Sequence, residues 1–273
     1  MHDPMCETLP KKKLNKTTYP CLGENTLSPL VLLPGWSFDS RIWQDLIKSL
    51  QQFTRVITLD LPGFGDNHWA FWNEAEAVCE NIVRTMPPRA VYAGWSLGGM
   101  LATKIAANFP ERVAGIITLA TNVSFVESQS WPHGMSIDKF KTFYNAVEKD
   151  LEEALKRFHL MIAQGDQLHR QQFRWLQAVA TQTSGYNNLL AMLSLLAKIS
   201  NCDDIHRLQA PGLHIFGEQD HLVPLSAVQQ LMESGAQGNN RQQYQRLENT
   251  GHLVFWPSDR VVPSIKKFLT ELC

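Results

Sequence analysis

Short apolar runs, several followed by a longer helical stretch, constrain the fold of this sequence more than any other feature. The runs are rich in Val, Ile and Leu and do not alternate with polar residues, which is typical of strands buried on both faces of a parallel sheet. They lie at Leu30–Leu33, Val56–Leu59, Ala90–Ala93, Gly115–Leu119 and Leu213–Phe216. Helical spacing fills several of the gaps, at Trp43–Leu50, Glu74–Met86 and Gly98–Phe109. This repetition predicts a doubly wound, mostly parallel α/β sheet.

One long segment, residues 122–200, interrupts this rhythm. Its apolar residues recur at helical spacing, and none of its runs is typical of a buried strand. We therefore predict a helical insertion at 122–200 between two parts of one core, 29–121 and 201–273. Residues 1–28 are polar and show no periodicity, so we expect a partly ordered extension there.

The overall charge limits the partners of the chain. Its 273 residues include 25 Lys and Arg against 26 Asp and Glu, for a net charge of −1, and only 19% of residues are charged. This balance gives no broad attraction to nucleic acid or to an anionic membrane, and we expect neither as a partner. No apolar run approaches the roughly 18 residues that span a bilayer.

The cysteines and the ends of the chain indicate a reducing, cytoplasmic location. Five cysteines are scattered without a Cys-x-x-Cys pair, and no signal peptide is visible. We also find no cluster with metal-ligand spacing and no Gly-x-Gly-x-x-G phosphate loop, so the sequence predicts neither a metal nor an organic cofactor.

The strongest local motif is Gly94-Trp95-Ser96-Leu97-Gly98, which fits Gly-x-Ser-x-Gly. It lies between a predicted strand and the small-residue start of a predicted helix, the context of a nucleophile elbow. Such a turn would lift Ser96 above the edge of the sheet, at a helix N-terminus that favours negative charge. We predict that Ser96 is a catalytic nucleophile, the alternative being an ordinary glycine-rich turn with a capping serine.

A serine nucleophile needs a base and an orienting acid, which in this arrangement follow in the order Ser, acid, His. Asp220 comes four residues after the strand Leu213–Phe216, and we prefer it over the nearby Glu218. His252 follows Gly251 in a loop after the predicted strand Gln243–Leu247. Of the nine histidines, His252 alone combines the right order with such a loop, and His221 is too close to Asp220 in sequence to serve.

The first strand loop, Pro34-Gly35-Trp36-Ser37, completes the predicted site. Acyl hydrolysis builds negative charge on the substrate oxygen, which two backbone N–H groups normally stabilise. We expect the N–H of Leu97 to supply one and the N–H of Trp36 the other, with the Trp36 indole lining the pocket. All these loops leave the carboxyl ends of strands, where open α/β sheets bind ligands.

These segments resemble the α/β-hydrolase superfamily from about Leu30 to the C-terminus, and most of all the pimeloyl-[acyl-carrier protein] methyl ester carboxylesterases of biotin synthesis. The resemblance rests on Leu32–Trp36, Leu59–Gly65, Gly94–Gly99, Pro110–Val113, Trp131-Pro132 and Arg157-Phe158. It implies an α/β-hydrolase fold with a helical cap. It also implies hydrolysis of the methyl ester on pimeloyl-acyl carrier protein, giving methanol and the free carboxylate.

The resemblance assigns roles to further residues. Ser96, His252 and Asp220 match the triad, and Trp36 and Leu97 match the positions that bind the ester carbonyl region. The acyl tunnel would be lined by Phe158, His159, Leu160, Met161 and Ile162.

Arginines on the cap would hold the acidic carrier protein in such a family. Arg157, Arg170 and Arg174 match this pattern. At a further position where the family has an arginine, this sequence has Glu153. A solvated helix face explains these arginines equally well.

The first loop also departs from the family, because Pro34 stands where a histidine is usual. We expect the enzyme to act as a monomer.

Two alternatives remain open at this point. The same triad would serve a general short-chain carboxylesterase or another acyl hydrolase that also takes small esters. A non-catalytic ligand receptor on the same fold is the alternative from a different class, since a fold alone does not determine function.

Overall fold

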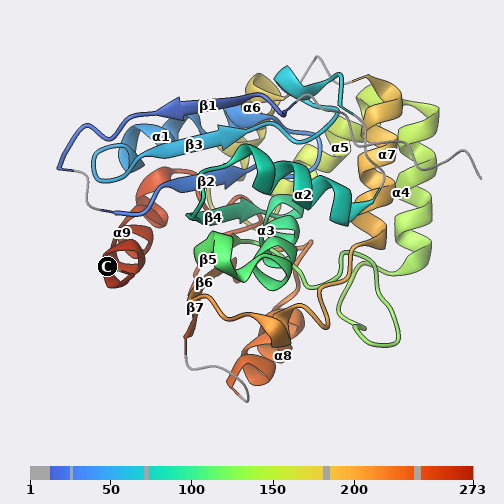
Figure 1. Cartoon of the computed structure of the whole chain (residues 1–273). Coiled ribbons are helices and arrows are strands. Elements are labelled where there is room, and N and C mark those ends of the chain that lie inside the picture. Colours follow the sequence, from blue (N-terminus) through green and yellow to red (C-terminus); the bar gives the residue numbers. More distant parts are fainter. Residues whose placement is uncertain (1–12, 25–26, 71–73, 181–184, 237–240, 273) are drawn as a thin grey trace, which may run out of the picture.

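The computed structural model describes residues 13–24, 27–70, 74–180, 185–236 and 241–272. Its strands are β1 (Lys16–Tyr19), β2 (Leu30–Leu33), β3 (Val56–Leu59), β4 (Ala90–Trp95), β5 (Val113–Leu119), β6 (Gly212–Gly217) and β7 (Gln242–Leu247). They form one sheet in the order β1-β3-β2-β4-β5-β6-β7, in which all neighbours are parallel except the antiparallel pair β1 and β3. The predicted doubly wound, mostly parallel sheet is therefore confirmed (Figure 1).

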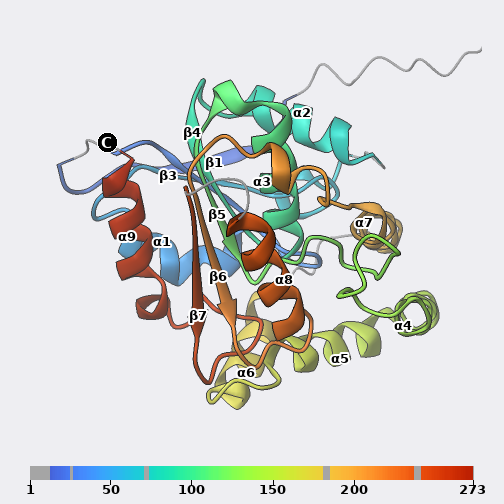
Figure 2. The ribbon, with the colours of Figure 1, turned by 90° about the horizontal axis from the view of Figure 1, so that it is seen from below.

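Helices cover both faces of the sheet, and a further group of helices lies to one side of it. Their bounds are α1 (Gln44–Leu50), α2 (Ala75–Thr85), α3 (Leu97–Asn108), α4 (Ile137–Lys149), α5 (Leu151–Ala163), α6 (His169–Val179), α7 (Tyr186–Lys198), α8 (Leu225–Ala236) and α9 (Val262–Glu271). Single turns of 3₁₀ helix lie at Ser40–Trp43, Gly65–Asn67, Pro110–Arg112, Ile205–Arg207 and Ser258–Arg260. Figure 2 shows α1 and α9 on one face of the sheet and α2, α3 and α8 on the other.

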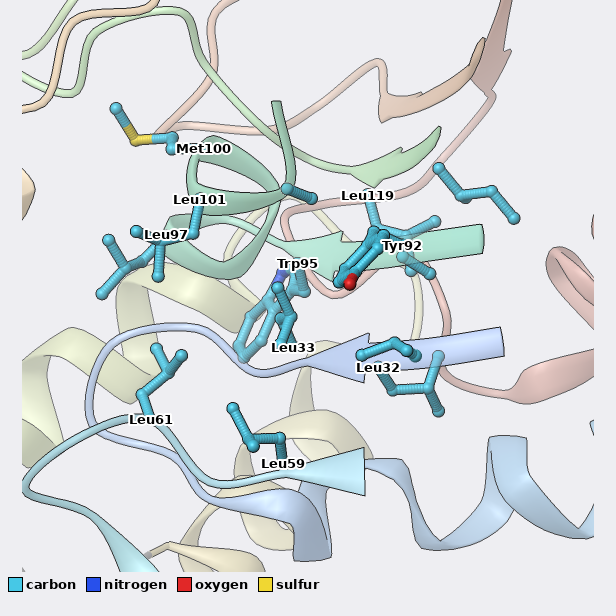
Figure 3. Close-up of a cluster of buried hydrophobic side chains, with 14 of the residues drawn as sticks. Leu32, Leu33, Leu59, Leu61, Tyr92, Trp95, Leu97, Met100, Leu101 and Leu119 are labelled. Carbon is cyan, nitrogen blue, oxygen red and sulfur yellow. The ribbon is translucent and has the colours of Figure 1, made fainter. Parts of the chain in front are cut away.

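The central strands are buried because helices cover both faces. Every residue of β2, β3 and β4 is buried, which explains why their sequences are almost continuously apolar. Figure 3 shows part of this core, in which leucines of the neighbouring strands and of α3 gather with Tyr92 and Trp95 of β4. The edge strand β7 contains only half-buried and exposed residues, as expected at the edge of the sheet.

The winding of the sheet determines where a site can form. Strand β2 pairs with β3 on one side and with β4 on the other, so the chain reverses its direction of winding beside β2. Ligands bind at such a reversal, outside the carboxyl ends of the two strands. The loops after β2 and β4, which carry Trp36 and Ser96, lie at this point.

Between β5 and β6 the described residues form four α-helices, α4 to α7, and the 3₁₀ turn Ile205–Arg207, and they contain no strand of the sheet. The two ends of this segment lie side by side, since Ser124 bridges Ser200 and the Asn201 N–H donates to the Val123 carbonyl at 2.9 Å. This proximity supports our proposed insertion at 122–200. Figure 1 shows α4, α5 and α7 grouped to one side of the sheet.

The N-terminal segment contributes a strand that sequence patterning did not predict. Residues 16–19 form β1, which pairs antiparallel with β3 and is mostly exposed. Its sequence, Lys-Thr-Thr-Tyr, is polar because an edge strand need not be buried, and its lysine is typical of a protected edge. The other parts of the predicted extension at 1–12 and 25–26 lie outside the described residues.

Candidate active site

The turn after β4 holds Ser96 in a backbone conformation that few residues adopt. Ser96 has φ 52° and ψ −117°, and its N–H donates to the Leu119 carbonyl at 3.0 Å. The flanking glycines make this turn possible: a Cβ on Gly94 would lie 2.1 Å from the Gly98 carbonyl oxygen, and one on Gly98 would lie 2.1 Å from that of Leu33. A strained serine persists only where the surrounding structure imposes it, and such residues are concentrated at functional sites. Helix α3 begins at the next residue, and the Ser96 side chain is half-buried.

Asp220, the predicted acid, lies in the loop after β6. Asp220 Oδ1 accepts hydrogen bonds from the N–H groups of Leu222 at 2.7 Å and Val223 at 3.0 Å. Its other oxygen, Oδ2, lies 2.8 Å from His252 Nδ1, and the Asp220 side chain is completely buried. The His252 ring contacts the carboxylate of Asp220, and the choice of Asp220 over Glu218 as the acid stays a prediction. His221 is exposed.

His252, the predicted base, lies in the loop after β7 and contacts the turn that carries Ser96. The Trp95 indole N–H donates to the His252 carbonyl at 3.0 Å, and the two rings are 5.5 Å apart, so His252 is fixed against the residue that precedes Ser96. A carboxylate only accepts, so Nδ1 carries the proton and Nε2 is free to accept one. Nε2 is buried and has no hydrogen-bond partner among the described residues. Catalytic hydrogen bonds are often long without substrate and tighten in the complex.

Two backbone donors face no acceptor near this serine. In the described part of the chain the N–H groups of Trp36 and Leu97 donate no hydrogen bond to another residue. Leu97 is the first residue of α3, where N–H groups lack a partner inside the helix. Together with the positive end of the helix dipole, they can stabilise an oxyanion.

An aromatic cluster joins the first loop to the cap. The Trp36 ring packs edge to face with Phe158 of α5 at 5.1 Å and with Phe143 of α4 at 5.6 Å, and its indole N–H donates to the Leu189 carbonyl of α7 at 3.0 Å. Through these contacts α4, α5 and α7, the helices of the proposed cap, pack against the loop that follows β2. Phe143 was not singled out from the sequence, because one aromatic residue in an amphipathic helix carries no distinguishing pattern.

The five residues expected to line an acyl tunnel do not share one environment. Phe158, His159 and Ile162 are buried and Met161 is half-buried, but Leu160 is 48% exposed. The physical reason is helical periodicity, because residues 158 and 162 lie on one face of α5 and residue 160 lies on the opposite face. Leu160 is therefore a surface residue here, which corrects its expected place in a buried tunnel.

His159 is a buried neutral histidine. Gln177 Nε2 donates to its Nδ1 at 2.6 Å, its ring lies 5.1 Å from Phe38, and its Nε2 has no partner among the described residues. Burial lowers the pKa of His159 to about 4. The neutral ring is therefore a polar group within apolar and aromatic surroundings, and nothing holds it as a cation.

The three cap arginines lie on exposed faces of two packed helices. Arg157 on α5 pairs with Glu153 at 2.9 Å, and both side chains are largely exposed. Arg170 and Arg174 lie one turn apart on α6 and are exposed. Glu153, the position that departs from the arginine pattern, thus partly neutralises Arg157. Exposed pairs of this kind contribute about 0 to 1 kcal/mol.

No group of three or more His, Cys, Asp or Glu suited to a metal lies in the described residues. Within the same part of the chain, no helix is both long and apolar enough to cross a membrane.

Comparison with known proteins agrees with this architecture. Residues 30–263 match the alpha/beta hydrolase family. The chain is 35% identical over 244 residues to the biotin biosynthesis bifunctional protein BioHC of Cellvibrio japonicus, covering 89% of this chain and 48% of that protein. It is 33% identical over 206 residues to the pimeloyl-[acyl-carrier protein] methyl ester esterase of Vibrio campbellii, covering 75% of this chain and 81% of the esterase. The chain belongs to the alpha/beta hydrolase family.

Two further facts place this hydrolase among its relatives. It spans about half the length, 48% and 41%, of the bifunctional relatives it matches. Among solved structures, the esterase EaEST of Exiguobacterium antarcticum superposes with a TM-score of 0.80 at 16% identity, covering 94% of this chain and 95% of that one. At that identity the likeness shows the shared fold.

Sequence reasoning missed several polar residues that hold the hydrolase site together. Asp166, Gln172 and Arg260 form a buried network beside the His252 loop. Asp166 and Gln172 are six positions apart, but the bonds of Asp166 to Arg260 and of Gln172 to the Trp256 carbonyl join residues more than eighty positions apart, which no local pattern reveals. The Gly165-Asp166 pair between two helical stretches was the available signal, and it indicates only a turn.

Proposed function

We propose that this hydrolase is a serine carboxylesterase with Ser96 as nucleophile, His252 as general base and acid, and Asp220 as the group that orients His252. The observation that carries the proposal is the fully buried Asp220–His252 hydrogen bond of 2.8 Å, with the unpartnered Nε2 beside the strained elbow. A histidine so oriented accepts a serine proton and stabilises the imidazolium that forms.

The proposed reaction follows the usual two steps of acyl transfer. Ser96 Oγ attacks the ester carbonyl while His252 Nε2 takes its proton, and the N–H groups of Trp36 and Leu97 stabilise the oxyanion. The imidazolium then protonates the leaving alkoxide, which departs as an alcohol and leaves an acyl-serine. Water, deprotonated by the same Nε2, attacks the acyl-serine, and the carboxylic acid and free Ser96 are released.

The substrate we propose is the methyl ester of pimeloyl-acyl carrier protein, with methanol and the free ω-carboxylate as products. The relative from Vibrio campbellii, which is named for this activity, supports the choice. The aromatic cluster of Trp36, Phe143 and Phe158 supports it physically, because it offers an apolar wall at the site that suits a methylene chain.

The carrier protein would dock on the cap. We propose Arg157, Arg170 and Arg174 as its contacts, since exposed arginines pair well with carboxylates and phosphate. If they act in this way, replacing Arg170 and Arg174 by Ala raises KM for the carrier-linked ester far more than KM for p-nitrophenyl butyrate, which carries no protein. Equal effects on both substrates would remove the docking role and leave the esterase assignment standing.

The proposal includes a monomeric enzyme of the cytoplasm. The cysteines described as free, Cys21, Cys79 and Cys202, fit a reducing compartment. Size-exclusion chromatography with light scattering gives one 31.0 kDa species if the monomer assignment is right.

A genetic experiment tests the physiological assignment. The gene is introduced into a bacterium that lacks its pimeloyl-carrier methyl esterase and is plated without biotin. We expect growth with the wild-type gene and none with Ser96→Ala. Failure of the wild type to restore growth, with p-nitrophenyl butyrate hydrolysis intact in the extract, would instead indicate a general short-chain esterase. Absence of both activities would favour a receptor.

A further inference from the structure

The turn between α5 and α6, residues 164–167, sits directly against the loops that carry Asp220 and His252. Gly165 has φ +85°, and a Cβ on it would lie 2.2 Å from the Gln219 carbonyl oxygen, next to Asp220. The Gln167 N–H donates to the Asn249 carbonyl at 3.2 Å, close to His252. The cap therefore contacts both catalytic loops through one short turn.

Asp166 is the centre of this contact. Its side chain is completely buried, and its Oδ2 accepts hydrogen bonds from the Gly251 N–H at 3.2 Å and from Gln172 Nε2 at 2.9 Å. Oδ1 accepts from the Leu168 N–H at 2.7 Å. Gly251 immediately precedes His252, so a buried carboxylate of the cap holds the backbone of the proposed base.

Arg260 balances the buried charge. Its Nη1 and Nη2 lie 2.6 Å and 3.1 Å from the two Asp166 oxygens, in the bidentate arrangement that is the strongest form of such a pair. Gln172 extends the network, because its Nε2 also lies 3.2 Å from the Trp256 carbonyl and 3.4 Å from that of Leu253, the residue after His252. The chain on both sides of His252 is thus tied to one buried carboxylate and its partners.

The His252 loop has a second, independent tie to the acid loop. The Gln219 N–H donates to the Thr250 carbonyl at 3.0 Å, and the Thr250 N–H donates to Gln219 Oε1 at 2.9 Å. The His252–Asp220 bond would persist if the cap contact were lost, but the two loops would then be held beside Ser96 by the Trp95 indole bond to the His252 carbonyl and would have more freedom to shift together. The contribution of Asp166 is to fix the Asp220–His252 pair relative to the turn that carries Ser96.

We infer that Asp166, held by Arg260 and Gln172, is a positioning residue that fixes His252 relative to Ser96 and couples the seating of the cap to the reactivity of the serine. Phe158 and Ile162 lie on the helix that ends just before this turn, at Ala163. A displacement of the cap is therefore transmitted to His252. The inference rests on the proposed triad.

The test is Asp166→Asn, an isosteric change. Whichever oxygen becomes the NH₂ group, it faces only donors: the Gly251 N–H, Gln172 and Arg260 at the Oδ2 position, or the Leu168 N–H and Arg260 at the Oδ1 position. Active sites are counted with a fluorophosphonate, and hydrolysis of p-nitrophenyl butyrate is expressed per labelled site. Misplacement of a catalytic group by about 1 Å costs about a hundredfold. We expect kcat per site and the labelling rate to fall together by about 10- to 100-fold, with KM changed by less than about threefold.

Asp204 provides a matched control. It is also a buried carboxylate, paired with Lys104 at 3.0 Å and with Arg207, but its partners lie in α3 and the nearby 3₁₀ turn and not in the triad loops. Asp204→Asn should lower the melting temperature and the number of labelled sites while kcat per site stays within about twofold. A purely structural role for Asp166 would give the same result for both variants and would overturn the inference.

A second variant covers failure of Asp166→Asn to fold. Gln172→Met removes the donor to Asp166 Oδ2 without leaving a charge unpaired, and it should lower kcat per site by about three- to tenfold. Wild-type kcat per site in this variant would also contradict the inference. The two proposals are separable: a wild-type protein that is never labelled at Ser96 defeats the proposed function, whereas normal labelling with unaffected variants defeats only the positioning role.

Discussion

Replacing Asp220 by Asn tests the orientation of the proposed base more sharply than any other single change. The Asn carbonyl can still accept from the Leu222 and Val223 N–H groups, now at 2.7 and 3.0 Å from Oδ1, so the loop after β6 keeps its anchors. The new NH₂ group then faces His252 Nδ1, where the carboxylate oxygen lies at 2.8 Å. Two donors cannot pair, so the ring takes the tautomer with its proton on Nε2 and cannot accept the Ser96 proton.

The size of the effect follows from the geometry of this pair. A nitrogen–oxygen contact of 2.8 Å puts the carboxylate and imidazolium charges about 4 Å apart, worth about 4 kcal/mol at an effective dielectric constant of about 20. Because each 1.36 kcal/mol of barrier is about a factor of ten in rate, the lost stabilisation alone amounts to about a thousandfold. The wrong tautomer adds to this, so we expect kcat to fall by about 10³ to 10⁴.

The assay is p-nitrophenyl butyrate hydrolysis, with circular dichroism to check folding and Glu218→Gln as the matched control. Glu218 is the neighbouring acid of the same loop and should be replaceable with less than about a twofold change in kcat. A folded Asp220→Asn protein that keeps more than about a tenth of wild-type kcat, or a Glu218→Gln protein that loses as much, would refute the assignment of Asp220.

Three further predictions follow from single residues. Ser96→Gly should be inactive yet more stable to urea than Ser96→Ala by about 1 kcal/mol, because glycine relieves the strain at φ 52° that alanine keeps. Phe158→Ala should lower the free energy of unfolding by about 3 to 5 kcal/mol and raise KM most for long acyl esters, since it empties the cluster around Trp36. Burial lowers the pKa values of His159 and His214 to about 4, so both side chains stay neutral in the folded protein at higher pH. In the unfolded chain the same histidines bind protons below about pH 6.5. The free energy of unfolding measured with urea should therefore fall between about pH 6.5 and pH 4, by about 3 kcal/mol for each histidine.

Each of these has its own contradicting result. Equal stability of the glycine and alanine variants would mean that the turn at Ser96 is not strained. A loss below about 1 kcal/mol for Phe158→Ala would mean that its ring is not packed as described. Because carboxylates also titrate near pH 4, the control for the histidines is His159→Gln. In this variant the slope of the free energy of unfolding against pH should decrease by the equivalent of about one bound proton. An unchanged slope would count against a neutral His159.

Much of the architecture was predictable because the responsible signals are local. Continuous apolar runs identify strands buried on both faces, and Gly94 and Gly98 identify a turn too tight for a side chain. Ser96, Asp220 and His252 could be proposed together because parallel strands bring the loops at their carboxyl ends to one edge of the sheet. The structure then shows the Asp220–His252 contact directly.

What the sequence did not reveal depends on contacts between distant segments. Strand β1 is polar and short, so only its pairing with β3 identifies it. Leu160 carries an apolar side chain on the exposed face of α5, so its apolar character and the family resemblance did not reveal its exposure. The Asp166–Arg260 pair joins positions 94 residues apart, and neither residue lies in a recognisable motif.

The measurement that tests the central claim most directly is hydrolysis of methyl pimeloyl-acyl carrier protein by the purified chain, followed by mass spectrometry of the carrier and by assay of methanol. The account predicts conversion of the methyl ester to the free acid with one methanol per carrier, loss of this activity in Ser96→Ala, and a higher kcat/KM than for p-nitrophenyl butyrate. An intact carrier ester in the presence of enzyme that still hydrolyses p-nitrophenyl butyrate, or full activity in Ser96→Ala, would contradict it.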